Sequence, residues 1–148
     1  MTTLSTQERV AVARLQALLE LLPSALDRGL QPAGLTAFEY TLLETLADSD
    51  DRRLRPSALA ARANASLARL SRVVSSLERK GLVERVPCPA DSRATNAVLT
   101  PVGEVTYENS RQLHGAAVRA LVLDALEPDD VDDLSRVAGA ILTRLDRG

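Results

Sequence analysis

The sequence predicts one mainly α-helical domain with a small β-hairpin. The chain has 148 residues, about the size of a single domain. Signals for helix starts recur along it, whereas one pair of short apolar runs, at 82–86 and 97–99, is separated by the prolines and polar residues of a hairpin loop. Hydrophobic residues make up 45% and charged residues 26%, which is typical of a folded protein.

Two capping boxes mark the first two helices. In each box a hydroxyl residue is followed three positions later by glutamate: Ser5 by Glu8, and Thr36 by Glu39. After the first box, leucine and valine recur at spacings of three and four, which predicts an amphipathic helix over 5–22 that ends before a proline. After the second box, leucines at helical spacing predict another helix.

The middle of the chain has the pattern of two helices joined by a tight turn. A very short strand is predicted at 53–55, followed by a helix over 56–63 that begins with proline, whose missing N–H costs nothing at that position. Asn64 tolerates the left-handed conformation that the turn requires. Ser66 then caps a helix over 66–80, which ends before a glycine.

Two more helices follow the hairpin. Thr100 and the proline after it predict the start of a long helix that reaches about residue 126. Acidic residues open the last helix, whose apolar stripe runs from Val131 to Leu145. The central order of helix, turn, helix and hairpin predicts a winged helix-turn-helix, with additional helices at both ends of the chain.

Basic residues concentrate in the middle of the chain. Residues 52–96 carry a charge of +7 and the remainder −9, which gives −2 for the whole chain. A basic segment between acidic flanks predicts one surface that binds a polyanion. The alternative is a solvated basic face without a partner.

The helix predicted over 66–80 has one face of arginine and serine and one aliphatic face. At about 100° per residue, Arg69, Arg72, Ser76 and Arg79 fall on the polar face. We predict that this face lies in the major groove of DNA, where arginine reads guanine and serine reads either base type. An ordinary surface helix with an arginine stripe is the alternative.

The hairpin tip provides a second possible contact. Arg93 lies in the loop over 87–96, and an arginine at such a tip enters the minor groove, where the negative potential of narrow A/T-rich stretches is strongest. Asp91 is placed to orient the guanidinium through a bidentate pair. The alternative is a weak surface salt bridge between the two.

Three motifs occur together in this chain: a helix ending in LERKGLVER, a hairpin carrying DSR, and a strand ending in LT-x-x-G at Gly103. In this combination the chain resembles the MarR family of bacterial transcriptional regulators, and the flanking helices extend the resemblance over nearly all of it. The resemblance implies a single domain over 1–148. Within it, a winged helix-turn-helix lobe at 36–100 is flanked by helices at 5–22 and 101–147 that interlock in a homodimer.

The resemblance also implies roles for individual residues. The positions that match those facing bases and phosphates are Ser66, Leu67, Ala68, Arg69, Ser71 and Arg72. Arg93 matches the wing arginine, and Asp91 the acid that supports it. At the positions of Leu67 and Ala68, small polar residues are common in the family, whereas this chain has apolar ones. We therefore expect apolar contacts with thymine methyl groups there. The expected partner is a palindromic operator in double-stranded DNA, and the usual action in the family is repression.

Dimerisation has a separate physical argument. The first and last helices carry more apolar residues than one small domain can cover, among them Leu15, Leu18, Leu19 and Leu22. A second copy of the chain would bury them, and burial contributes roughly 25 cal/mol per Å². The sequence therefore predicts a homodimer, with a compact monomer as the alternative.

Two further features point to regulation. Many members of the family respond to small phenolic or lipophilic ligands, and Phe38, Tyr40, Tyr107 and His114 are candidates to line such a pocket, with core packing as the alternative. Cys88 lies near Arg85 and Arg93 in the sequence, and these would lower the pKa of its thiol, so a redox sensor is one interpretation and an incidental thiol the other.

Several function classes are disfavoured. The chain has no P-loop, G-x-S-x-G or H-E-x-x-H motif, so we expect no enzyme. One cysteine and one histidine argue against a disulfide, a metal site or a metal cofactor. Apolar runs are too short to span a membrane and no secretory signal is present, which predicts a cytoplasmic protein. A winged-helix adaptor that binds protein instead of DNA is the remaining alternative.

Overall fold

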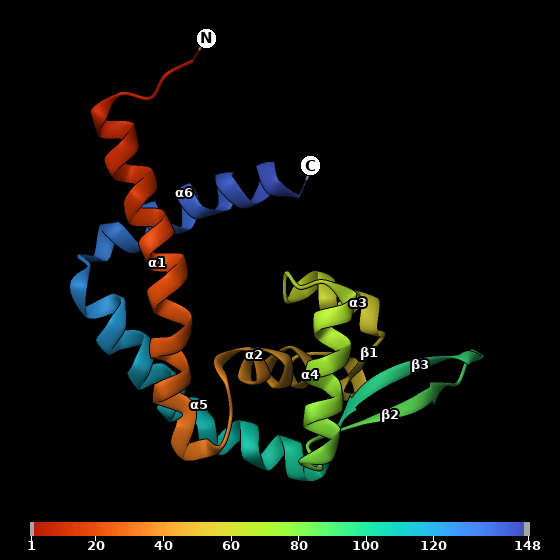
Figure 1. Cartoon of the computed structure of the whole chain (residues 1–148). Coiled ribbons are helices and arrows are strands. Elements are labelled where there is room, and N and C mark those ends of the chain that lie inside the picture. The colour runs from red at the N-terminus through yellow and green to blue at the C-terminus, as the bar shows by residue number, and fades with distance from the viewer. Residues whose placement is uncertain (1, 147–148) are drawn as a thin grey trace.

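The computed structural model describes residues 2–146 and contains a helical lobe with a small sheet, next to long terminal helices (Figure 1). The elements are α1 (Thr6–Leu30), α2 (Ala37–Ala47), β1 (Arg53–Leu54), α3 (Pro56–Arg62), α4 (Leu67–Arg79), β2 (Val83–Cys88), β3 (Asp91–Leu99), α5 (Pro101–Leu121) and α6 (Pro128–Leu145), with three short 3-10 helices at Gln31–Ala33, Asp50–Arg52 and Leu123–Ala125. The sheet is antiparallel with the order β1-β3-β2. The mainly helical fold with a β-wing is the one that the sequence predicts.

Local signals determine most helix starts. The Ser5 hydroxyl accepts a hydrogen bond from the Glu8 backbone at 3.1 Å, and the Ser5 N–H donates to the Glu8 carboxylate at 2.7 Å. Thr36 and Glu39 form the same reciprocal pair. The caps predicted for the first two helices are therefore confirmed.

The first helix extends beyond its predicted end. We expected it to end at residue 22, before Pro23, but α1 continues to Leu30 with Pro23 inside it. A proline removes one helical hydrogen bond. Here α1 packs along α5, and Gly29 lies so close that an added Cβ would come within 2.7 Å of the Ala117 Cβ. This packing compensates for the lost hydrogen bond.

The turn between α3 and α4 is confirmed. Asn64 has a φ of 53°, which is the left-handed conformation. The Ser66 hydroxyl accepts a hydrogen bond from the Arg69 backbone N–H at 3.1 Å and so caps α4. Gly81, with a φ of 75°, ends that helix and leads into β2.

The wing has longer strands than the sequence indicated. The loop predicted over 87–96 is mostly paired strand: β2 reaches Cys88, β3 begins at Asp91, and the register is irregular between Pro87 and Cys88. Backbone hydrogen bonds pair these strands whatever their side chains, and a hairpin that projects into solvent needs no apolar alternation. Figure 1 shows β2 and β3 projecting from the lobe.

The helix after the wing ends earlier than predicted. The helix expected to reach residue 126 ends at Leu121, because Val122 leaves the helical region with φ −128° and ψ −63°. The last helix begins as expected, with a capping box between Glu127 and Asp130. The predicted boundary at residue 147 lies outside the described residues. No helix in 2–146 is both long and apolar enough to cross a membrane.

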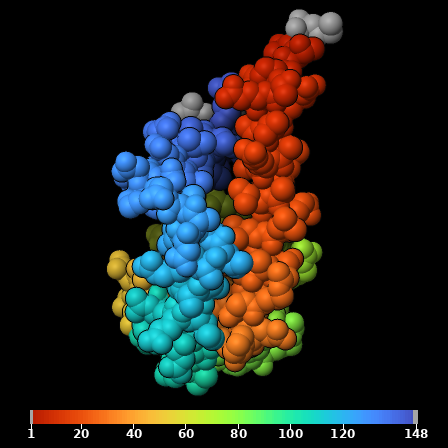
Figure 2. Space-filling model, turned by 90° about the vertical axis from the view of Figure 1, so that its left-hand side faces the viewer, coloured from red at the N-terminus to blue at the C-terminus, as the bar shows by residue number. Residues whose placement is uncertain are grey.

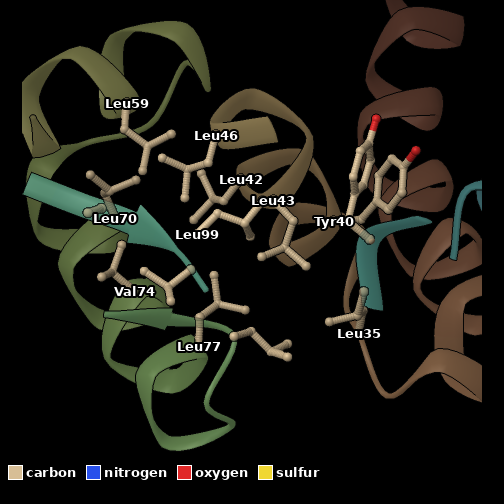
Figure 3. Close-up of a cluster of buried hydrophobic side chains, with 14 of the residues drawn as sticks. Leu35, Tyr40, Leu42, Leu43, Leu46, Leu59, Leu70, Val74, Leu77 and Leu99 are labelled. Atoms are coloured by element: carbon tan, nitrogen blue, oxygen red, sulfur yellow. The ribbon is translucent and has the colours of Figure 1, made fainter. Parts of the chain in front are cut away.

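The core lies between α2, α3, α4 and the sheet (Figure 3). Leucines of α2 face Leu70, Val74 and Leu77 of α4, all of which are buried. This confirms the aliphatic face predicted for the helix over 66–80. Burial of that face determines which side of α4 points outward.

Gly103 provides a test of how closely α5 approaches the wing. A Cβ at this position would lie 2.0 Å from the Leu82 carbonyl oxygen and 2.7 Å from the Leu99 Cδ1. We expect Gly103→Ala to lower the free energy of unfolding by about 3 kcal/mol, because backbone must move to accept the methyl group. Urea denaturation at one fixed protein concentration measures this.

Gly115→Ala is the matched control within the same helix. Its Cβ would meet nothing within 4 Å, so helix propensity alone predicts a gain of about 0.5–1 kcal/mol. Equal stability of the two variants would contradict the close approach at Gly103.

Candidate nucleic-acid interface

One side of α4 is held by the wing. Arg85 of β2 donates hydrogen bonds to the Ser71 carbonyl oxygen at 3.1 Å and to the Ser75 hydroxyl at 3.3 Å, and it forms an ion pair with Glu78. All three partners lie on the same flank of α4. Arg85 therefore fixes the angle between the helix and the wing, and its guanidinium is already occupied.

The opposite side of α4 is held by the first turn of α2. The Lys80 Nζ lies 2.8 Å from the Glu39 carboxylate and 3.0 Å from the Gly34 carbonyl oxygen. The Glu39 side chain is only 5% exposed, so this ion pair is largely shielded on one side. The Arg69 guanidinium lies 4.0 Å above the centre of the Phe38 ring.

The outward side of α4 is free. Arg72 and Arg79 are exposed, and among residues 2–146 neither forms an ion pair. Leu67 is 56% exposed and Ala68 is also exposed, both in the first turn. Ser76 is half-buried. The predicted polar face thus divides into an outward side with Arg72 and Arg79 and a flank with Arg69.

The wing tip carries another free arginine. Arg93 is exposed and is the third residue of β3. It therefore lies close to the tip of the hairpin, which projects from the lobe (Figure 1). The expected bidentate pair with Asp91 is absent from the described residues; instead, the Asp91 Oδ1 accepts a hydrogen bond from the Arg93 backbone N–H at 3.0 Å. A local bond to the backbone restricts fewer rotatable bonds than pairing two exposed side chains. Asp91 shapes the turn, and within residues 2–146 the Arg93 guanidinium has no carboxylate partner.

The arrangement is that of known DNA-binding regulators along the whole chain. AbsC of Streptomyces coelicolor, a MarR family transcriptional regulator, is 33% identical with a TM-score of 0.92, and both chains are covered completely. Sco3205 of the same organism, solved in complex with DNA, is 35% identical with a TM-score of 0.91 over 96% of this chain and 89% of that one. The chain belongs to the MarR family.

Two more comparisons agree with this assignment. The family model described as MarR family matches residues 29–94. A mutant MarR of E. coli complexed with operator DNA is 26% identical with a TM-score of 0.79, over 95% of this chain and 99% of that one. Among curated proteins, none matches the chain significantly. Members of the MarR family are transcriptional regulators, not enzymes, as the sequence predicted.

Much of the basic charge counted in the sequence braces the MarR fold. Arg52 has a left-handed backbone with a φ of 57° and pairs with Glu104 of α5. It also donates to the Ala47 carbonyl oxygen at 3.1 Å, which ties the end of α2 to α5. Arg62 donates to the Ser49 hydroxyl at 3.3 Å. The charge of +7 over 52–96 therefore overstates the charge available to a ligand. Sequence patterns gave no sign of these pairings, which join positions far apart in the chain.

Three of the four candidate ligand residues lie together. Tyr40 of α2 stacks on His114 of α5, with ring centres 4.1 Å apart, and lies 5.6 Å from the ring of Tyr107. The Tyr40 hydroxyl donates to Glu44 at 3.2 Å, and burial raises the pKa of both tyrosines above the ordinary value. Phe38 lies elsewhere, under Arg69.

Cys88 is half-buried at the end of β2, where β2 meets the tip of the wing. The pKa of its thiol is lowered, first by a hydrogen bond from the Ala90 backbone and next by Arg55, whose Nη2 lies 3.8 Å from the sulfur. The arginine next to the thiol is thus Arg55, just before α3. The sequence had suggested Arg85 and Arg93, which are nearer in the chain.

The lowered pKa of Cys88 predicts that its thiol is alkylated at lower pH than an ordinary cysteine. We expect the rate of reaction with iodoacetamide to rise with pH around a midpoint below the ordinary thiol value of about 8.5, because the thiolate is the reacting form. Arg55→Ala should raise the midpoint only part of the way, since the Ala90 N–H remains. Arg62→Ala, which removes an arginine that bonds Ser49 instead, is the control; the same shift in both variants would contradict the assignment.

Proposed function

We propose that this chain is a homodimeric regulator that recognises a specific DNA sequence, with α4 in the major groove and the β2–β3 wing in the minor groove. The observation that supports this best is the outward side of α4, where Arg72 and Arg79 have no ion-pair partner among residues 2–146. It lies beside a hairpin that carries Arg93 near its tip. The residues proposed to contact DNA are Ser66, Leu67, Ala68, Arg69, Ser71, Arg72, Ser76, Arg79, Asp91 and Arg93. As a regulator of bacterial DNA, the protein would act in the cytoplasm.

Different residues would contribute differently to this contact. Arg72 and Arg79 point outward from the middle and the end of α4. In the major groove, an arginine at such a position forms bidentate hydrogen bonds with guanine. The Ser66 hydroxyl caps α4, and the Ser71 hydroxyl lies 3.4 Å from the Arg85 Nη2. The role of these two serines is therefore to position the helix. Asp91 acts in the same way, through the backbone of the wing turn.

The dimer proposal rests on apolar surface that the chain itself leaves uncovered. No residue of α6 is buried, and its stripe from Val131 to Leu145 is exposed throughout. Leu18 and Leu19 of α1 are 56% and 66% exposed. Figure 2 shows α1 beside α5, with the N-terminal end of α1 projecting beyond the rest of the molecule. A second copy would cover these faces and place two α4 helices on a palindrome.

The domain organisation follows from these assignments. We assign residues 36–100 to the DNA-binding lobe and the terminal helices to the dimer. The N-terminal part is longer than the predicted 5–22, because α1 extends to Leu30. The long α5 leads from the wing lobe into the dimer part and so connects them.

We further propose that the protein represses a nearby gene and that a small aromatic or lipophilic ligand releases it. A dimer on an operator would exclude polymerase from the same DNA. CouR of Rhodococcus jostii RHA1, which shares the fold at 20% identity and a TM-score of 0.75 over 95% of each chain, is solved with p-coumaroyl-CoA. Tyr40, Tyr107 and His114, between α2 and α5, are the residues we would first vary in a ligand screen.

A second possibility, favoured by the lowered pKa of Cys88, is regulation by oxidation of this thiol. Cys88 lies in the wing, so a sulfenic acid there would alter the hairpin that carries Arg93. Loss of DNA binding in peroxide that Cys88→Ser prevents would establish this mode. The alternative function, a protein-interaction adaptor without DNA binding, is tested by measuring binding to DNA.

Fluorescence anisotropy with the DNA next to its own gene, over a series of salt concentrations, tests DNA binding. We expect two protomers per site and a steep fall in affinity with salt, because bound arginines release counterions. Arg72→Ala should lower affinity for the operator about 10- to 100-fold and relax its specificity. Arg93→Ala should weaken binding and reduce the salt slope.

Arg136→Ala is the charge-matched control, since this exposed residue lies on α6, outside the lobe and away from the apolar stripe. It should bind like the natural chain. If no duplex binds at low salt, the adaptor interpretation replaces the regulator.

Light scattering coupled to size exclusion tests the dimer. The expected mass is twice the 15.9 kDa of one chain. Ile141→Glu should shift the protein towards monomer, because it places a charge within the apolar stripe of α6. Arg136→Glu changes an exposed residue of the same helix and should remain dimeric. A natural chain that elutes as a monomer at micromolar concentration would refute the proposal.

A further inference from the structure

We propose that Arg69 and Phe38 form a phosphate clamp at the rim of the major groove. In this clamp the ring of Phe38 orients the Arg69 guanidinium towards a phosphate of the DNA backbone. The inference rests on the DNA-binding function proposed above. It gives Phe38, which the sequence suggested as a ligand residue, a role in positioning an arginine.

The position of Arg69 on α4 separates it from the other arginines. It is the third residue of the helix, and its guanidinium turns sideways to lie 4.0 Å above the Phe38 ring. At about 100° per residue it lies roughly 60–80° around the helix from Arg72 and Arg79. Arg69 therefore lies on the flank that faces α2, whereas Arg72 and Arg79 lie on the outward side.

Phe38 is itself held in place. It is the second residue of α2 and is half-buried against the leucine core. The next residue, Glu39, binds Lys80 just after the end of α4. The first turn of α2 thus contacts both ends of α4, so the ring under Arg69 has a fixed position relative to the recognition helix.

Stacking on a ring leaves the guanidinium ready for an anion. A guanidinium that stacks on a ring presents its flat face to the ring, and its N–H donors then point outward in its plane. The central carbon of Arg69 lies 4.0 Å from the ring centre, within reach of such stacking. Arg52 and Arg85, by contrast, direct their donors to Glu104 and Glu78. Among residues 2–146, no carboxylate forms an ion pair with Arg69.

The flank position favours a phosphate over a base. A helix in the major groove directs its outward side to the base edges, and its flanks pass the sugar-phosphate backbones that form the rim. A guanidinium held sideways between α4 and α2 meets the rim. Such a contact strengthens binding to every sequence equally and adds to its salt dependence.

The test is a double-mutant cycle measured by anisotropy on the operator and on a scrambled duplex over a salt series. Arg69→Met should weaken both complexes by the same factor and lower the salt slope by about one per protomer. Phe38→Leu keeps the apolar volume and removes the ring; it should weaken binding about 3- to 10-fold when Arg69 is present and have no effect beside Arg69→Met. Phe38→Tyr, which keeps the ring, should bind like the natural chain.

Three outcomes would overturn the clamp. Equal weakening by Phe38→Leu with and without Arg69 would mean that Phe38 acts through packing alone. A changed ratio of operator to scrambled affinity in Arg69→Met, with the salt slope kept, would mean that Arg69 reads a base. No change in Arg69→Met would mean that it does not touch DNA.

Failure of the clamp and failure of DNA binding are distinguishable. Only the second abolishes binding of the natural chain to every duplex. Thermal melting of each variant reports folding, and Arg69→Lys provides a surface variant should Phe38→Leu unfold. The lysine keeps the charge but lacks the planar group, so it should retain most of the salt slope and lose affinity.

Discussion

The burial of one side of α4 is the constraint on which the functional surface depends. Leu70, Val74 and Leu77 lie in the leucine core against α2, and this packing orients the helix about its own axis. Because the buried side is determined, so is the opposite side, with Arg72 and Arg79. A groove-binding helix needs this rotation to be accurate, since an error of one residue turns every side chain by about 100°.

The arginines of the lobe divide between bracing the fold and remaining free. Those that meet a carboxylate, such as Arg52 and Arg85, hold α4 and α5 in place, and their donors are used within the chain. Arg72, Arg79 and Arg93 have no such partner among the described residues. Arg69 is intermediate, because an aromatic ring holds it without occupying its N–H groups. Net charge alone does not reveal this division, which depends on which acids lie nearby in space.

The terminal helices present the opposite situation, with apolar surface that the described residues leave exposed. Every residue of the α6 stripe is exposed, and the N-terminal part of α1 projects away from the lobe. A dimer that covers these faces would also set the distance between two α4 helices. Dimer packing and operator spacing would then be coupled through α5. The stacked pair of Tyr40 and His114 joins α2 of the lobe to α5, so it lies on this connection.

The sequence by itself determined the features that depend on neighbours three or four residues away. The caps at Ser5, Thr36 and Ser66 and the aliphatic face of α4 are such features, because their hydrogen bonds and periodicity are local. Tertiary structure decided whether α1 passes through Pro23, because packing on α5 compensates there. It also decided that Arg69 rests on Phe38, since these residues are distant in the chain and only the fold brings a ring beneath the guanidinium.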